Sequence, residues 1–269
     1  MKLDYPLKFE PNFHPALWGG ESWVVSAHEA GPGVIANGSL KGKTLREVMP
    51  DFPLLFKVIE AKTRLSVQVH PNEVTRKVTG GDPKTEMWCM LDDGFIYAGL
   101  KPGVGPAEIE AAVESGSFEE LMVRHDAKAG DVFFIPGGLV HAIGDNARIF
   151  EVQQSSNTTF RLYDWGRVGA DGKPRELHVA KSLQAIDYSL KAPEAVAAVK
   201  CRFFDFRPVE VSGSLALAAC PGSFTVLTAF RGNASVNGVA FAEGESVLVP
   251  EGVAMEIVAS SVKLLVTTL

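Results

Sequence analysis

The sequence predicts a mainly β protein, a sandwich or barrel of short strands with a few helical insertions. Short runs rich in Val, Ile, Phe and Thr recur between Gly, Pro and Asn turns through most of the 269 residues. Helical periodicity, by contrast, is confined to two stretches. An internal repeat further indicates that one strand-and-turn unit occurs twice.

Six runs show the strand pattern most clearly, because each is rich in β-branched or aromatic residues and is bounded by turn residues. They are Leu54–Ile59, Leu65–His70, Glu86–Leu91, Asp131–Ile135, Ala147–Gln153 and Thr158–Tyr163. Helices are expected at Pro106–Val123, which has Pro near its start and apolar residues at helical spacing, and near Glu176–Tyr188. We expect both helices to be insertions on a β framework.

The internal repeat relates Gly130–His141 to Gly244–Met255, which share the pattern G-x5-P-x-G-x2 and then end in His or Met. The pattern predicts a Gly turn, a buried strand and a Pro-x-Gly corner that aims one side chain. Two unrelated strand-turn units are the alternative interpretation. We favour two similar β modules, of which the second has lost its polar residue.

These modules set the predicted domain organisation. A stretch rich in Ala, Pro and Glu lies within residues 191–200, and it separates a domain of residues 1–195 from a domain of residues 196–269. The first domain is expected to carry the chemistry.

Composition excludes several classes of function. The net charge is −6 and the Lys and Arg residues are scattered, so a nucleic-acid partner is not expected. The three cysteines, Cys89, Cys201 and Cys220, form no CxxC pair, which argues against a disulfide framework and for a reducing compartment. No run of 18 apolar residues and no apolar leader occurs, so we expect a cytoplasmic protein without a membrane partner.

Polar residues at spacing two mark the chemistry. In an extended strand Ser66, Gln68 and His70 share one face, and Lys84 and Glu86 likewise share a side. A polar face can simply be wetted by solvent. However, His141 follows a Gly-rich corner that permits close approach of a ligand. Two imidazoles and a carboxylate are ligands typical of a catalytic metal site, and the side-chain oxygen of Gln68 offers a fourth ligand.

Two later strands add charges. Glu151 and Arg161 both alternate with apolar neighbours, which places a carboxylate and a guanidinium on polar faces. Burying such charges is costly unless they are paired or used in chemistry. A structural Glu151–Arg161 ion pair is the alternative to a catalytic role.

The motifs resemble those of a known superfamily and of one family within it. Gly130–His141 is similar to the second signature motif of the cupin superfamily, and Gln68-x-His70 to the first, with Gln in place of the usual first His. Separate blocks across residues 9–190 resemble the type I mannose-6-phosphate isomerase family in its short bacterial form. These blocks are Trp18-Gly19-Gly20, Leu54–Pro71, Lys84-Thr85-Glu86 and His141-Ala142-Ile143, with Glu151, Ser155, Asn157 and Arg161.

The resemblance implies a cupin-type jelly-roll β-barrel followed by a degenerate cupin-like β module without metal ligands. It implies one zinc per chain, bound by Gln68, His70, Glu86 and His141. By the same resemblance, the catalytic Arg is Arg161, the site Lys is Lys84 and the site carboxylate is Glu151. We expect Ser66, Lys84 and Arg161 to bind the substrate.

The implied reaction interconverts mannose 6-phosphate and fructose 6-phosphate by proton transfer through an enediol(ate), with a small phosphorylated hexose as partner. Two other functions stay open. One is a different metal-dependent cupin enzyme, such as an iron dioxygenase, which commonly uses two His and one carboxylate. The other is a sugar-binding cupin without catalysis. The pair Lys84 and Arg161 argues against an oxygenase acting on a neutral substrate.

Overall fold

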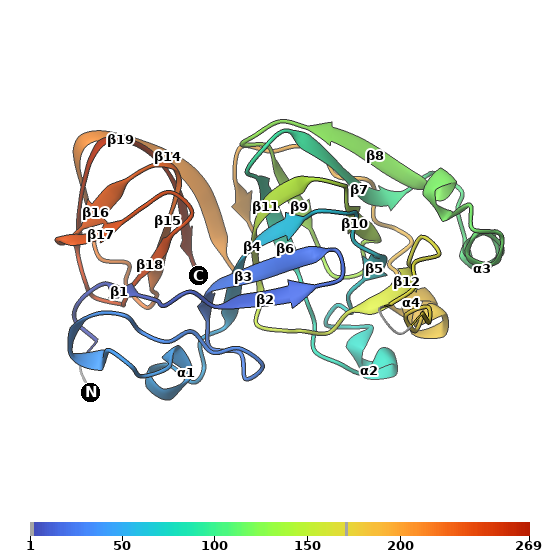
Figure 1. Cartoon of the computed structure of the whole chain (residues 1–269), viewed down its shortest axis with the longest axis horizontal. Helices are drawn as coiled ribbons and strands as arrows, with labels where there is room; N and C mark the ends of the chain where they lie inside the picture. The colour runs from blue at the N-terminus through green and yellow to red at the C-terminus, as the bar shows by residue number, and fades with distance from the viewer. Residues whose placement is uncertain (1–2, 170–171) are drawn as a thin grey trace. The chain divides into compact units, whose positions relative to one another are not determined.

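The computed structural model describes residues 3–169 and 172–269 and divides by contacts into two compact units (Figure 1). Unit 1 contains the chain up to Phe13, Ser22–Val58 and Val196–Leu269, and unit 2 contains His14–Glu21 and Ile59–Ala195. The structure is mainly β with few helices, as predicted. Among the described residues, no helix is long and apolar enough to cross a membrane.

The division differs from the predicted domains 1–195 and 196–269, because the chain up to Phe13 and Ser22–Val58 group with the C-terminal segment. Strand β1 (Leu7–Lys8) pairs antiparallel with β18 (Ser246–Val249). The rings of Phe52 and Phe224 also pack with centroids 4.5 Å apart. A two-residue strand carries too little pattern to show its distant partner, so the sequence did not indicate this grouping.

Two sheets build the part of the fold that carries the predicted site. The first has the order β2-β3-β4-β11-β6-β9 and the second has the order β12-β5-β10-β7-β8. The strands of the first are β2 (Phe13–Ala16), β3 (Gly19–Ser26), β4 (Leu54–Ala61), β6 (Glu86–Met90), β9 (Val132–Ile135) and β11 (Ala147–Gln154). Those of the second are β5 (Val67–Val69), β7 (Gly94–Leu100), β8 (Met122–Ala127), β10 (His141–Ile143) and β12 (Phe160–Tyr163).

The second sheet separates two apolar clusters. Ile96, Ala98 and Ile143 join Trp88 and Ile149 of the first sheet in the core between the sheets. On the opposite face of the second sheet, a further cluster includes residues of helices α3 (Pro106–Ser115) and α4 (Val179–Ala185). This cluster contains Val67, Val69, Tyr97, Val140, Ala142, Ile109, Ala112 and Ala185. The alternation along β5 therefore leaves its polar residues facing the interior between the sheets.

The six predicted strands all occur, with ends shifted by one or two residues. Strand β5 covers Val67–Val69, so Ser66 and His70 flank the regular strand on either side. The predicted helix Pro106–Val123 is shorter than expected, because Gly116 at φ 77° ends α3. A 3-10 turn, η2 (Phe118–Leu121), follows it, and then β8. Helix α4 lies inside the expected stretch, and a further short helix, α2 (Arg76–Thr79), follows β5.

Unit 1 contains an eight-stranded sheet with the central order β1-β18-β15-β19-β14-β13. The other strands of this sheet are β13 (Val199–Lys200), β14 (Asp205–Leu217), β15 (Thr225–Gly232), β16 (Ala234–Val236), β17 (Val239–Phe241) and β19 (Met255–Thr268). Unit 1 also contains the 3-10 turn η1 (Gly38–Leu40) and helix α1 (Leu45–Val48). Helix α1 begins with a capping box in which Thr44 and Glu47 bond each other's backbone.

The predicted internal repeat is present in the backbone. In each copy a positive-φ glycine, Gly130 or Gly244, precedes a four-residue strand, β9 or β18, at the same offset. A second positive-φ glycine follows each strand, and the next strand begins at His141 in one copy and at Met255 in the other. The same corner thus presents an imidazole in unit 2 and a thioether in unit 1.

Candidate metal centre and active site

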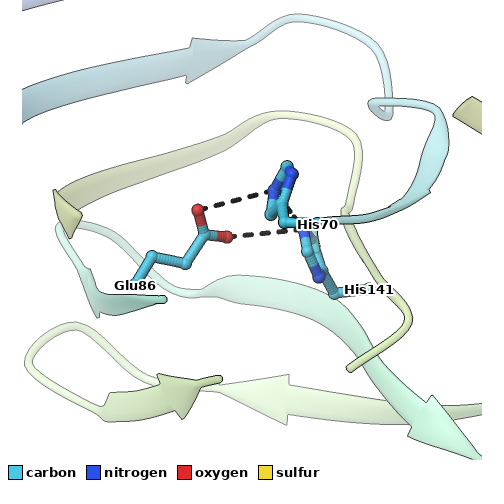
Figure 2. A group of neighbouring side chains, drawn as sticks. All are labelled: His70, Glu86 and His141. Atoms are coloured by element: carbon cyan, nitrogen blue, oxygen red, sulfur yellow. Dashed lines mark hydrogen bonds and ion pairs between the residues drawn. The ribbon is translucent and has the colours of Figure 1, made fainter. Parts of the chain in front are cut away.

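Three side chains meet between the two sheets: His70, Glu86 and His141. Figure 2 shows one Glu86 oxygen directed at each histidine, with Oε2 3.6 Å from His70 Nε2 and Oε1 3.4 Å from His141 Nε2. The two Nε2 atoms lie 3.1 Å apart. All three residues are at most 1% exposed, so the group is shielded from bulk solvent.

The elements that present these residues explain why distant parts of the sequence converge. His70 directly follows β5, Glu86 begins β6 and His141 begins β10. Strand β10 pairs with β5 so that His141 lies directly opposite Gln68. Residues directly opposite in an antiparallel pair point to the same face. The histidine of the second sheet thus faces the glutamate of the first.

The backbone fixes the tautomer of both imidazoles. The Nδ1–H group of His70 donates to the carbonyl of Thr158, and that of His141 donates to the carbonyl of Leu139, each at 2.8 Å. Since Nδ1 carries the hydrogen, Nε2 is the nitrogen of each ring that has a lone pair available when the ring is neutral, and this atom faces the Glu86 carboxylate. Metal-bound histidines typically show this arrangement. Two lone pairs 3.1 Å apart beside a carboxylate favour a cation between them, so the residues fit a metal ion.

Lys84 adds a buried positive charge to this group. Its Nζ lies 2.6 Å from Glu86 Oε2, 3.2 Å from His70 Nε2 and 3.8 Å from Glu151 Oε1. Burial lowers the pKa of Lys84, but the Glu151 and Glu86 carboxylates outweigh burial and raise the pKa above its usual value. The ammonium form is therefore favoured in this pocket.

His141 stays neutral across the physiological range. Burial, followed by the charge of Lys84, lowers the pKa of His141 to about 3. Neutral imidazole is the form that binds a metal ion. The same burial that excludes water thus keeps this nitrogen available as a ligand atom.

Glu151 lies beside this group on β11. It is 2% exposed, and its Oε2 accepts the indole N–H of Trp88 at 2.9 Å while Oε1 faces Lys84. Glu151 and Trp88 are directly opposite in the β11–β6 ladder. Sequence analysis did not single out Trp88, although its position two residues after Glu86 places it on the same strand face.

Two of the remaining predicted residues, Gln68 and Arg161, lie in the second sheet. Arg161 of β12 is directly opposite Gln68 of β5, so Arg161, Gln68 and His141 form one row across three strands. Arg161 Nη1 donates to the carbonyl of Glu176 at 2.9 Å. Burial and the neighbouring Arg175 lower the pKa of Arg161. Ser66 is 5% exposed and precedes this row rather than belonging to it.

A second charged cluster that the sequence analysis missed lies beyond Arg161. Asp164, 5% exposed, accepts hydrogen bonds from Arg175 at 2.6 and 2.7 Å and from Arg167 at 2.6 Å. With Arg161, these residues give three guanidinium groups near one buried carboxylate. The sequence signal was weak, because the three arginines lie six and eight residues apart without periodicity.

The two-sheet β architecture and its buried His-Glu-His group define a metal-binding enzyme of the cupin type. Residues 10–87 match the family model described as phosphomannose isomerase type I, catalytic domain. Mannose-6-phosphate isomerase ManA of Bacillus subtilis is 33% identical over an alignment of 298 positions that covers 92% of this chain and 93% of that protein. The chain therefore belongs to the type I mannose-6-phosphate isomerase family, as the sequence motifs predicted.

Further comparisons agree. The mannose-6-phosphate isomerase of Streptococcus mutans is 32% identical over an alignment of 253 positions that covers 78% of this chain and 80% of that protein. The crystal structure of the mannose 6-phosphate isomerase from Bacillus subtilis has a TM-score of 0.87 at 26% identity and covers 98% and 99% of the two chains. The apo form of the Salmonella typhimurium enzyme shares the fold, with a TM-score of 0.70 at 14% identity and coverage of 100% and 99%.

Proposed function

We propose that this chain interconverts mannose 6-phosphate and fructose 6-phosphate, with one zinc ion bound by Gln68, His70, Glu86 and His141. The convergence of two Nε2 lone pairs on one buried carboxylate carries the proposal, because that arrangement suits a metal ion. Gln68 is the fourth proposed ligand, since it lies directly opposite His141. Family membership supports a phosphorylated hexose as the substrate. A cytoplasmic location is consistent with the metabolism of such a sugar phosphate.

The donor set supports zinc as the metal. Imidazole nitrogen and carboxylate oxygen are common zinc ligands in catalytic sites that leave a position open to substrate. Zinc, when bound, would polarise a substrate oxygen as a Lewis acid and contribute several kcal/mol of charge stabilisation. Two His and one carboxylate also suit iron, so the identity of the metal is part of the test.

Glu151 is the proposed proton carrier. The proton leaves C2 of the aldose for the Glu151 carboxylate, and the C–H electron pair forms the C1–C2 double bond of an enediolate. The proton then returns at C1, while the O2 hydroxyl proton moves to O1 to leave a C2 carbonyl. Glu151 is 2% exposed, so its carboxylate is shielded from bulk water, as a group that carries a substrate proton needs to be.

Lys84 and Arg161 would balance the charge of the reaction. Lys84 is buried between two carboxylates, and its ammonium group would stabilise negative charge that develops on the substrate oxygens. Arg161 is the proposed partner of the enediolate or phosphate, and its planar fork fixes geometry that a lysine would not. Ser66 is proposed as a further substrate contact.

One preparation tests metal and reaction together. Metal content is measured by elemental analysis, and conversion of mannose 6-phosphate is measured before and after chelation, with an identically dialysed sample as the control. Zinc near one per chain, with activity that chelation abolishes and zinc restores, is the expected result. Bound metal without isomerisation would refute the proposal. Iron content with oxygen uptake would favour the dioxygenase, and sugar binding without turnover would favour a binding cupin.

A further inference from the structure

Trp88 connects the proposed proton carrier to a proposed metal ligand. Its side chain is fully buried, and its Nε1–H donates to Glu151 Oε2 at 2.9 Å. The indole also meets the His141 ring edge-on, with centroids 5.2 Å apart and 83° between the ring planes. Trp88 thus contacts two groups to which the reaction assigns different tasks.

The contact follows from the register of the sheet. Trp88 of β6 and Glu151 of β11 are directly opposite, so both side chains leave the same face at short distance. An indole N–H can only donate, and it needs an acceptor when it is buried. Hydrogen bonds to charged acceptors are stronger than those between neutral groups. The pairing of β6 with β11 therefore holds the indole N–H of Trp88 next to the Glu151 carboxylate.

This bond makes the two oxygens of Glu151 unequal. Oε2 receives the indole hydrogen, whereas Oε1 lies 3.8 Å from Lys84 Nζ. Lys84 also contacts Glu86 and His70, so Oε1 is the oxygen on the side of the metal centre. A proton carrier must be held within hydrogen-bond reach of the reacting group, and a glutamate side chain has several rotatable bonds to restrict.

We propose that Trp88 is a positioning residue for the isomerisation, which holds Glu151 so that Oε1 accepts and returns the substrate proton. This inference rests on the proposed function. It adds that the aromatic residue two positions after Glu86 acts through the carboxylate rather than through the metal.

Trp88→Phe tests the role directly, because it removes the N–H group and keeps an aromatic ring beside His141. We expect kcat to fall about tenfold, KM to stay within about twofold and metal content to stay near one per chain. Met90→Leu is the matched control, because Met90 is fully buried and follows two residues later on the same strand. It should leave all three quantities within about twofold of the wild type.

A double variant separates positioning from structural support. If Trp88 acts through Glu151, Trp88→Phe should change the kcat of a Glu151→Ala enzyme by less than about twofold. Equal losses in both backgrounds, or loss of metal in Trp88→Phe, would overturn the assignment. Trp88→Tyr also lacks the indole donor and replaces the Phe variant if that protein does not fold. Wild-type turnover is measured first: its absence refutes the proposed function and this inference together, whereas an active wild type with an equally active Trp88→Phe refutes this inference alone.

Discussion

At the scale of single residues, charge and tautomer make this site suitable for a cation. Two carboxylates, Glu86 and Glu151, face one ammonium, Lys84, and the two imidazoles direct lone pairs into the same space. A buried group with this balance is stabilised by further positive charge. The backbone contributes as much as the side chains, because the carbonyls of Thr158 and Leu139 decide which imidazole nitrogens are available.

Arg161→Lys tests the role of the guanidinium. We expect kcat to fall at least about tenfold, equivalent to about 1.4 kcal/mol of barrier, because an ammonium lacks the planar pair of N–H donors that a guanidinium offers to an anionic substrate. Zinc should stay near one per chain, since Arg161 is not a proposed ligand. Arg124→Lys, an exposed residue paired with Asp126, is the control and should leave kcat unchanged. Unchanged turnover in Arg161→Lys would remove this residue from the mechanism.

Asp164→Asn tests the neighbouring charged cluster through its pH dependence. Burial raises the pKa of Asp164, but hydrogen bonds from Arg175 and Arg167 outweigh burial and hold the pKa below its ordinary 3.8. The folded state therefore gains stability from this carboxylate above about pH 4 and loses it as the pH falls through the folded pKa. We expect Asp164→Asn to lower the free energy of unfolding by about 1–3 kcal/mol at pH 7.

Urea unfolding at several pH values measures this effect. The difference between wild type and Asp164→Asn should shrink as the pH falls from about 4 through the folded pKa of Asp164, because the unfolded carboxyl takes up a proton first and the folded carboxyl does so at lower pH. Asp126→Asn is the control, since Asp126 is 81% exposed and pairs at the surface. A difference that persists unchanged at low pH would contradict this account.

At the scale of elements, periodicity predicted most of the site, and its limits are physical. Alternation placed Gln68 and His70 on one face of a strand, and the repeat located the corner before His141. Neither signal contains the pairing of β6 with β11, because cross-strand partners are chosen by packing between distant segments. The Trp88–Glu151 bond could therefore not be predicted. The end of α3 was predictable from Gly116, a typical helix-terminating residue.

Gly138→Ala tests the corner that aims His141. Gly138 has a φ of 96°, and an added Cβ would lie 2.9 Å from the Cβ of Asp187. Its N–H also donates to the His70 carbonyl at 2.8 Å, so a shift here moves both proposed histidine ligands. We expect destabilisation of about 2 kcal/mol or more, and zinc affinity at least about tenfold lower.

The internal repeat supplies the matched control. Gly252 stands at the same place in the second copy, with a φ of 76° and open space where a Cβ would go. Gly252→Ala should cost only the conformational penalty of about 1 kcal/mol and leave zinc affinity unchanged. Denaturant unfolding and a competitive zinc titration compare the two variants. Equal effects on zinc affinity would show that the corner does not orient the ligands.

At the scale of the whole molecule, each of the two compact units is built from segments that are not consecutive in the sequence. The stretches up to Phe13 and Ser22–Val58 belong to unit 1, whose large sheet comes mainly from Val196–Leu269. Sequence motifs located the chemistry in the segment that forms most of unit 2. They could not show that the N-terminal stretches fold with the C-terminal ones, because Leu7 and its partner Leu248 lie far apart in the sequence and no local pattern describes their pairing.

Truncation after residue 195 tests this dependence. The shortened chain keeps β1 and Phe52 but loses their partners β18 and Phe224. Leu7 is fully buried in the intact protein and Phe52 is 4% exposed, so truncation would expose apolar side chains that each contribute about 1.5–3 kcal/mol when buried. We expect the fragment to aggregate or to lose most of its activity, measured by soluble yield and turnover beside the full chain. Phe224→Ala in the full chain provides a milder comparison and should cost about 3–5 kcal/mol of unfolding free energy. A soluble fragment of residues 1–195 with full activity would show instead that the C-terminal segment is dispensable for the folding and the activity of the rest of the chain.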